Sequence, residues 1–336
     1  MLRLLTLFAV LAFAAPRASA ADAKPLALEG HAAGVPAVVF IGDGKILATG
    51  SEDKTIKLWD AATGKELVTL KTGSVQSLAS TADGRRFASA GHDGTVKVWD
   101  AATRVELLTL KGQKGDAAGL AFAPDGKTLA VGGGEFDLKA EKARGEIRLW
   151  DAAAGKELAR IEWPDNRVTN VAFAPDGQTL AACSSNGAVA LWDAATGKKV
   201  SDLGKNPNGA TGLTFSPDGK LVACGNFFRE LTIKVWDVAT GKETGTISKS
   251  NNVSAFSLKF LPDGKTLAVG GFDQQSVRDE KTRGAYLALI AIDGKTERVL
   301  TGHIRGVTCI SVSRDGTRLA VSGLDKTARV WELKEK

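Results

Sequence analysis

The sequence predicts an all-β fold, a closed seven-bladed β-propeller of four-stranded antiparallel blades, from three repeated features. A Trp-Asp pair or a close variant recurs along the chain, and an Asp-Gly pair recurs at a second fixed place. Apolar runs of strand length flank both pairs. Repeats of about 40 residues with four strands each are typical of propellers, in which stacked repeats share one core. We therefore expect a single domain over residues 21–336, although 336 residues would otherwise suggest two or three.

The Trp-bearing stretch Ser51–Leu67 shows the first feature. Ile56 and Leu58 alternate with Thr55, Lys57 and Trp59, which is the period of two expected of a strand. Each such stretch predicts a turn, a strand, a second turn and the start of another strand. Related stretches follow at Trp99-Asp100, Trp150-Asp151, Trp192-Asp193, Trp236-Asp237 and Trp331-Glu332.

The Asp-Gly pairs give the period of the repeat. Their successive spacings are 40, 42, 51, 42, 45 and 52 residues. Because Asp and Gly both tolerate positive φ, each pair predicts a hairpin turn between two strands. The seven pairs are Asp43-Gly44, Asp83-Gly84, Asp125-Gly126, Asp176-Gly177, Asp218-Gly219, Asp263-Gly264 and Asp315-Gly316.

Residues 1–20 have the pattern of a signal peptide. Arg3 precedes the apolar segment Leu4–Ala15, and Ala18-Ser19-Ala20 fits a cleavage site before Ala21. Twelve residues are too few to span a bilayer, and no Cys follows that would allow a lipid anchor. We expect a secreted or periplasmic protein, and the alanine-rich leader suggests a bacterial one.

Charge and residue counts exclude several classes of function. The formal net charge of +6 falls to +4 once Arg3 and Arg17 are removed, and no basic block exists, so we expect no nucleic-acid partner. An odd number of cysteines (Cys183, Cys224 and Cys309) argues against a disulfide framework, and their strand-like surroundings predict burial. The sequence contains no calcium loop, P-loop, nucleophile elbow or metal-binding His spacing, so we expect no cofactor, metal or catalytic residue.

Across residues 25–335 the chain resembles the WD40 (Trp-Asp) repeat family. The first repeat carries Gly30-His31, Asp53 and Trp59-Asp60, and the last carries Gly302-His303, Asp325 and Trp331-Glu332. The resemblance implies that His, Asp and Trp join a Ser or Thr of the second strand in a hydrogen-bonded structural tetrad. The candidates for the fourth member are Thr49 or Ser51 in the first repeat and Ser322 in the last.

The middle repeats depart from this pattern. The second keeps Asp93 and Trp99 but has no Gly-His pair, and the sixth has lost its Trp, with Leu289 aligned in that place. Only the terminal repeats therefore keep the residues for a tetrad. The last repeat ends without a fourth strand, and the resemblance implies that the N-terminal strand Pro25–Leu28 completes it.

Most candidate binding residues lie in long connections that the resemblance places on the face of the Gly-His loops, and Trp163-Pro164 of repeat 4 stands where repeat 1 has Gly30-His31. Gly132–Gly145 and Gly270–Gly284 are insertions before the third strand of repeats 3 and 6, and Asn226–Glu230 is a shorter one. Aromatic and Arg side chains are enriched where interfaces derive their energy, although such aromatics also anchor their own loops. The candidates are Phe136, Arg144, Trp163, Phe227, Phe228, Arg229, Phe272 and Arg283.

These observations favour an exported, monomeric, non-catalytic scaffold that binds a protein or peptide on the long-loop face of blades 3 to 6. One alternative is a propeller enzyme, lactonase-like or quinoprotein-like, which needs converging His or carboxylate groups at the channel. Another is a small-ligand or glycan binder that uses the aromatic loops. A broad apolar surface would favour a protein partner.

Overall fold

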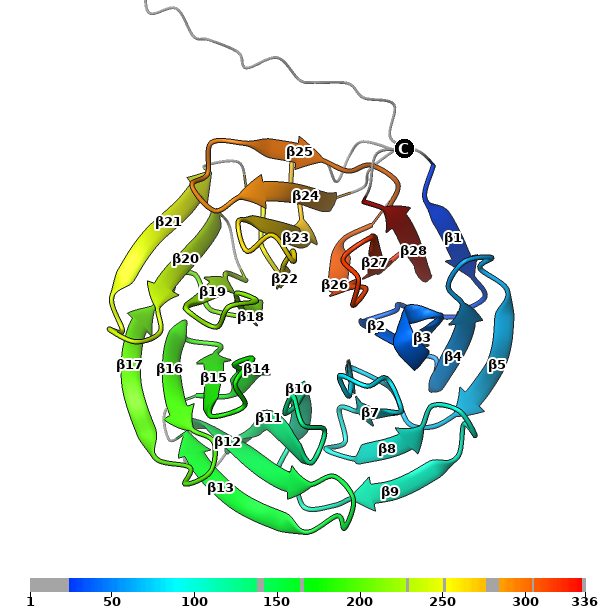
Figure 1. Ribbon diagram of the computed structural model, residues 1–336, viewed down its shortest axis with the longest axis horizontal. Coiled ribbons are helices and arrows are strands. Elements are labelled where there is room, and N and C mark those ends of the chain that lie inside the picture. Colours follow the sequence, from blue (N-terminus) through cyan, green and yellow to red (C-terminus); the bar gives the residue numbers. More distant parts are fainter. Residues whose placement is uncertain are drawn as a thin grey trace, which may run out of the picture.

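The computed structural model describes residues 24–137, 142–163, 166–227, 230–249, 252–275, 284–303 and 305–333. The predicted signal peptide lies outside these residues. The described chain forms seven four-stranded antiparallel sheets, arranged as blades around a central channel (Figure 1). A single 3-10 turn at Gly42–Gly44 is the only helical element within the described ranges. The predicted seven-bladed β-propeller is therefore confirmed.

The strands follow the chain outward within each blade, and the first strand of each blade faces the channel (Figure 1). Blades 1 to 3 consist of β2 (Ala37–Ile41), β3 (Ile46–Gly50), β4 (Thr55–Asp60) and β5 (Glu66–Lys71); β6 (Ser77–Ser80), β7 (Arg86–Ala90), β8 (Val96–Asp100) and β9 (Glu106–Leu110); and β10 (Asp116–Phe122), β11 (Thr128–Asp137), β12 (Lys142–Asp151) and β13 (Glu157–Trp163).

Blades 4 to 6 repeat this order. They consist of β14 (Val168–Phe173), β15 (Thr179–Ser184), β16 (Ala188–Asp193) and β17 (Lys199–Lys205); β18 (Leu213–Phe215), β19 (Leu221–Gly225), β20 (Leu231–Asp237) and β21 (Glu243–Lys249); and β22 (Ser257–Phe260), β23 (Thr266–Phe272), β24 (Ala285–Ala291) and β25 (Glu297–Val299).

Blade 7 closes the ring with strands from both ends of the chain. It contains β26 (Val307–Val312), β27 (Arg318–Gly323), β28 (Thr327–Glu332) and, outermost, β1 (Leu26–Glu29). β1 pairs antiparallel with β28, so that Leu26 lies opposite Val330 and Glu29 opposite Thr327. The N-terminal strand thus completes the last blade, which removes the open edges that a ring of repeats would otherwise expose.

Apolar side chains between neighbouring blades form the core. In β4, Ile56 and Leu58 pack toward Phe87 and Trp99 of blade 2. On the other face of the same strand, Trp59 packs with Leu28, Val38 and other residues on the side of blade 7. Because each third strand lies between two blades, both of its faces are covered, and alternation alone does not reveal which side chains are buried.

The Asp-Gly pairs form the expected turns between the first and second strands, with one difference in backbone geometry. In blade 1 both Asp43 and Gly44 have positive φ, at 56° and 78°. In the other six blades only the glycine does. There the Asp carboxylate accepts a backbone N–H two residues on, as Asp83 Oδ1 does from Arg85 at 3.0 Å, which stabilises the turn through the side chain.

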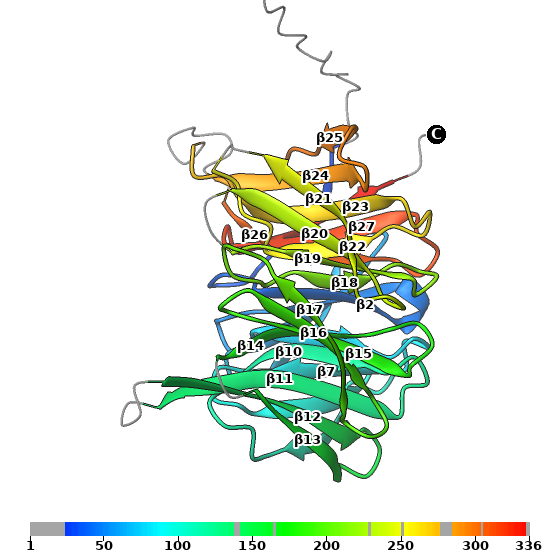
Figure 2. The same cartoon turned by 90° about the vertical axis from the view of Figure 1, so that its left-hand side faces the viewer.

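Two details of the blades differ from the sequence prediction. In blade 6 the position opposite Leu267, which holds Trp in the other blades, is Ile290 and not Leu289. The described part of the blade 3 insertion is not an irregular loop but lengthens β11 and β12, which stay paired as far as Asp137 and Lys142. This hairpin projects beyond the rest of the ring on one face (Figure 2).

Candidate functional site

The two faces of the ring have distinct connections. Each first strand runs toward its Asp-Gly turn, and the second strand returns, so the turn between the second and third strands lies opposite the Asp-Gly turns. The connections between blades share that opposite face, here called the loop face. The long β11–β12 hairpin lies on this face (Figure 2), and the described candidates Arg144, Trp163, Phe227 and Phe272 belong to segments at the loop-face ends of their strands.

On the loop face of blade 1, four side chains form a linked set. His31 Nδ1 lies 2.8 Å from Asp53 Oδ2, and His31 Nε2 lies 2.8 Å from Thr49 Oγ1. The Trp59 indole N–H donates to the same Thr49 oxygen at 2.8 Å. Thr49 is therefore the fourth member, while the Ser51 hydroxyl donates to the carbonyl of Gly34 at 2.9 Å.

This network favours an ionised Asp53 beside a neutral His31. Burial lowers the pKa of His31 below its ordinary 6.5, against the opposing effect of Asp53. Burial alone would raise the pKa of Asp53, but hydrogen bonds from Thr55, the Ala32 N–H and His31 outweigh it and hold that pKa at about 2. A neutral imidazole donates on one nitrogen and accepts on the other, as a link between Asp53 and Thr49 requires.

Blade 7 does not form the same set, and the assignment of Ser322 to a tetrad was wrong. Val321 pairs with Arg329 in blade 7, and Thr49 pairs with Lys57 in blade 1. Val321 therefore occupies the position equivalent to that of Thr49. Ser322 is one residue further along, so its side chain points to the other face of the strand and meets Thr308 Oγ1 at 3.2 Å. His303 still contacts Asp325 at 3.0 Å, but its Nε2 meets the Val321 carbonyl at 3.2 Å.

The consequence for blade 7 is an indole group without an acceptor. The buried Trp331 Nε1 has no hydrogen-bond partner among the described residues. In blade 2, by contrast, Trp99 donates to Ser89 at 2.9 Å although that blade lacks a Gly-His pair. Within the described chain, only blade 1 therefore carries a complete His, Asp, Thr and Trp set.

Trp163 does not lie on an accessible surface, so its prediction as a binding residue was wrong. It ends strand β13, is 8% exposed and packs against Trp192 of the next blade, with ring centroids 5.0 Å apart. The two indoles belong to the apolar core between blades 3 and 4. The Trp163 side chain therefore folds inward and forms part of the core, which was the alternative to a binding role.

Phe227 is the best-placed of the predicted aromatics. It is 42% exposed on the loop face, and its ring lies 5.1 Å from that of Phe256 in a tilted arrangement. Its N–H donates to the Asn208 carbonyl at 3.2 Å, which fixes the backbone beneath the ring. An aromatic side chain held in this way loses little conformational freedom on binding.

The remaining candidates divide into three groups. Arg144 is exposed on the projecting hairpin. Phe272 is half-buried and packs against Gly284 and Gly306, where added Cβ atoms would come within 2.6 Å and 2.8 Å of its ring, so it anchors its own loop. The side chain of Phe136 and the whole of Phe228, Arg229 and Arg283 lie outside the described residues.

A polar cluster on the loop face was missed at the sequence level. Arg167, before blade 4, contacts Asp116 of blade 3 at 2.6 Å. Burial raises the pKa of Asp116 despite the positive charge of Arg167. Asp116 Oδ1, Arg167 Nε and both side-chain polar atoms of Gln113 are buried without a hydrogen-bond partner in the described chain. No motif marks these residues, because they come together only through the docking of two blades.

The central channel was not assigned any residues from the sequence. A cavity of about 460 Å³ is lined by the innermost strands of all seven blades and reaches Pro175 and Pro217, next to two of the Asp-Gly turns. One ring of equivalent positions lies four residues before each Asp-Gly pair, opposite an alanine of the second strand. Its members are Val39, Ala79, Ala121, Ala172, Thr214, Lys259 and Ser311.

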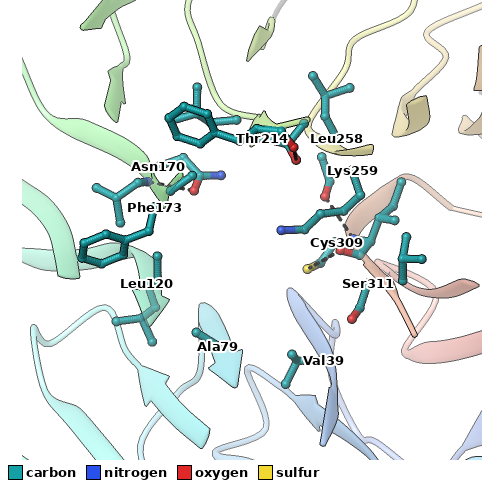
Figure 3. A pocket seen from close by; sticks show the side chains of 18 of the residues that line it. Val39, Ala79, Leu120, Asn170, Phe173, Thr214, Leu258, Lys259, Cys309 and Ser311 are labelled. Carbon is teal, nitrogen blue, oxygen red and sulfur yellow. Dashed lines mark hydrogen bonds between the residues drawn. The ribbon is translucent and has the colours of Figure 1, made fainter. Parts of the chain in front are cut away.

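This ring is chemically uneven. Blades 1 to 4 contribute aliphatic side chains, whereas blades 5 to 7 contribute Thr214, Lys259 and Ser311. Figure 3 shows the Lys259 amine reaching into the cavity beside Cys309, across from a wall that contains Asn170, Phe173 and Leu120. Lys259 is the one charged side chain among the residues that line the cavity.

The fold and its repeats define the chain as a propeller built from WD-type repeats. The family described as "WD domain, G-beta repeat" matches residues 24–60, 64–100, 155–193, 197–237 and 294–332, which is more than half of the chain. The chain therefore belongs to the WD40 family. The unmatched intervals contain most of blades 3 and 6, the two with long insertions.

Curated relatives match short segments. "Protein Mut11" of Chlamydomonas reinhardtii is 56% identical over 43 residues, which are 13% of this chain and 12% of that protein. "Vegetative incompatibility protein HET-E-1" of Podospora anserina is 57% identical over 37 residues, 11% of this chain and 3% of that protein. The matches thus cover a small part of each relative and indicate shared repeats.

Two further findings concern the described residues alone. No group of three or more His, Cys, Asp or Glu side chains within them is arranged to hold a metal ion. None of the helical structure described is long and apolar enough to cross a membrane. A WD40 propeller of this kind is consistent with a non-catalytic binding scaffold, since such propellers commonly bind proteins.

Proposed function

We propose that this protein is an exported, non-catalytic WD40 scaffold that holds a protein or peptide segment against the loop face of blades 3 to 6. The observation that carries the proposal is the exposed ring of Phe227 on that face, supported from behind by Phe256. Partly exposed aromatic residues in a fixed setting are typical anchors of protein interfaces.

The polar cluster of Gln113, Asp116 and Arg167 does not enter this proposal, because its unpaired polar atoms are buried and out of reach of a docking partner.

Exposed apolar residues outside the loop face provide positions for a control substitution. Val105, Leu158, Val200 and Val299 are about half exposed and lie in or beside the outermost strands, away from the loop face. A partner that binds through the loop face does not depend on them. Export rests on the predicted signal peptide and is part of this proposal.

The test is capture of a binding protein by the chain from residue 21 onward, beside F227A, R144E and the control V200A. The proposal expects one protein that wild type and V200A capture equally and that F227A and R144E lose, with all four baits folded by circular dichroism. Equal capture by F227A would overturn the proposed face. Failure of the wild-type chain to capture any protein from its native envelope or medium would overturn the scaffold role.

A further inference from the structure

Lys259 gives the central channel an unbalanced positive charge. Among the residues that line the cavity it is the only charged side chain, and no carboxylate is present there. It makes no ion pair or hydrogen bond with any described residue, although Lys and Asp or Glu are common elsewhere on the chain. Lys259 is exposed to the solvent of the channel, and its ammonium group raises the local concentration of anions there.

Lys259 differs from the residues at the equivalent positions of the other blades. In blades 2 to 4 the position holds Ala79, Ala121 and Ala172, so the fold itself needs nothing larger there. The strand pairing is the same in blade 6, where Lys259 faces Ala268. The lysine is therefore not required to build the blade, and the close-up shows its amine directed into the cavity (Figure 3).

A second donor lies on the same side of the channel. Ser311 Oγ accepts the N–H of Phe40 at 3.2 Å, so its own O–H is available to donate toward the cavity. The sulfur of Cys309, which also lines the cavity, contacts the Val38 carbonyl at 3.6 Å. One cation and one hydroxyl donor suit a group with a single negative charge and oxygen acceptors.

The aliphatic side chains that line the cavity indicate the chemistry of the uncharged part of the ligand. Val39, Ala79 and Leu120 of blades 1 to 3 line part of the cavity with aliphatic carbon, while Asn170 of blade 4 lies across from Lys259. The cavity of about 460 Å³ falls within the volume range of small-molecule sites, and its lining combines apolar side chains with the polar groups of Asn170, Thr214, Lys259 and Ser311. A hydrocarbon body fits against the aliphatic part of the lining while its charged end meets Lys259.

We infer that the central channel binds a small organic monocarboxylate, with its carboxylate on Lys259 and Ser311 and its apolar body against blades 1 to 3. The cavity reaches the Asp-Gly end of the channel, opposite the loop face, so this site is distinct from the proposed protein-binding face. Small-ligand binding here is additional to the scaffold role and does not depend on Phe227.

The test uses hexanoate and benzoate as probes, with hexanamide, benzamide and inorganic phosphate for comparison, measured by calorimetry and ligand-observed NMR. The wild-type chain should bind the carboxylates with one site and bind the amides and phosphate at least tenfold more weakly. Lys259→Ala, which copies the alanine of blades 2 to 4, should weaken carboxylate binding about 10- to 100-fold. Lys259→Arg should retain most of the binding.

Two controls separate this site from general charge and from the loop face. Lys265→Ala removes an exposed lysine from the Asp-Gly turn of the same blade and should leave binding unchanged. F227A should also bind hexanoate like wild type, whatever its effect on protein capture. Equal binding of carboxylate and amide, undiminished binding by folded Lys259→Ala, or no binding of either carboxylate would each overturn the inference.

Discussion

The indole N–H of Trp59 donates to the hydroxyl of Thr49 across the middle strands of blade 1, whereas Trp331 meets Val321 at the equivalent place and has no acceptor among the described residues. Val and Thr have nearly the same shape, so the two blades differ at this point by one hydroxyl group. A buried donor without a partner costs about 1–3 kcal/mol.

Exchanging the two residues tests this relationship. Thr49→Val should lower the free energy of unfolding by about 1–3 kcal/mol, because it leaves the Trp59 N–H unpaired. Val321→Thr should raise it by about 1 kcal/mol, a gain of about 2 °C in melting temperature for a domain of this size. Thermal unfolding and the NMR shift of the indole protons are the measurements.

Ser322→Ala serves as the control for blade 7. Because the Ser322 hydroxyl meets Thr308 and not Trp331, its loss should not move the Trp331 indole resonance. A stabilising effect of Val321→Thr without a change in that resonance would contradict a new hydrogen bond to Trp331 as its cause.

The His31–Asp53 pair predicts loss of stability in acid. The pKa of folded His31 lies below 6.5, so the unfolded state takes up the proton first, and the contribution of His31 is complete above pH 6.5 and falls below it. The pKa of Asp53 falls from 3.8 to about 2, so its contribution is lost as the pH falls through that interval.

Melting temperatures measured from pH 8 down to pH 3 check this prediction. His31→Gln, which cannot take up a proton, should show a lower melting temperature at neutral pH but a flatter slope just below pH 6.5. An unchanged slope in that interval would mean that His31 is not the group responsible.

Cys309 should be the only cysteine that reacts in the folded protein. It lines the channel and is half-buried, whereas Cys183 and Cys224 are fully buried. Burial raises the pKa of the Cys309 thiol, so alkylation should be slow at neutral pH and faster in base. Mass spectrometry after treatment with iodoacetamide should find one label in the native state and three after unfolding, and native labelling of Cys183 would contradict the structure.

The fold was predictable from sequence because repetition supplies the same evidence seven times. The contacts of single side chains were harder to predict. Ser322 carries a hydroxyl next to the tetrad position, but alignment of Leu47-Ala48-Thr49 with Leu319-Ala320-Val321 shows that a valine occupies the position itself. One residue of register reverses the face of a strand.

Burial between blades explains the other differences. Trp163 resembled a loop aromatic by its place in the repeat, but the following blade supplies Trp192 to cover it. The Asp116–Arg167 pair likewise joins residues 51 positions apart in two blades, which no local pattern reveals. Lys259 had a detectable signal, since it lies four residues before Asp263 at a place where three of the other repeats have alanine and none has a charged residue.

Because β1 closes the ring, removal of the short segment that contains it should strongly destabilise the protein. Deletion of residues 24–29 should cause aggregation or a large fall in melting temperature, because it uncovers the edge of β28 and the core around Leu28. Leu28→Ala, which keeps the strand, should cost about 2–5 kcal/mol. A variant that begins at Lys24 is the control, and an unchanged melt of the deletion variant would disprove closure by this strand.

Trp163 and Phe227 should respond to substitution in opposite ways, although the sequence placed them in one group. Trp163→Ala removes a buried indole from the contact with Trp192 and should lower the free energy of unfolding by about 3–5 kcal/mol. Phe227→Ala removes an exposed ring and should change it by no more than about 1 kcal/mol, while it abolishes capture of the bound protein. Chemical denaturation of both variants, compared with V200A, measures the first effect, and the capture assay measures the second. A strongly destabilised F227A would show that the ring anchors its own loop, as Phe272 does, and would leave the loop face without its aromatic anchor.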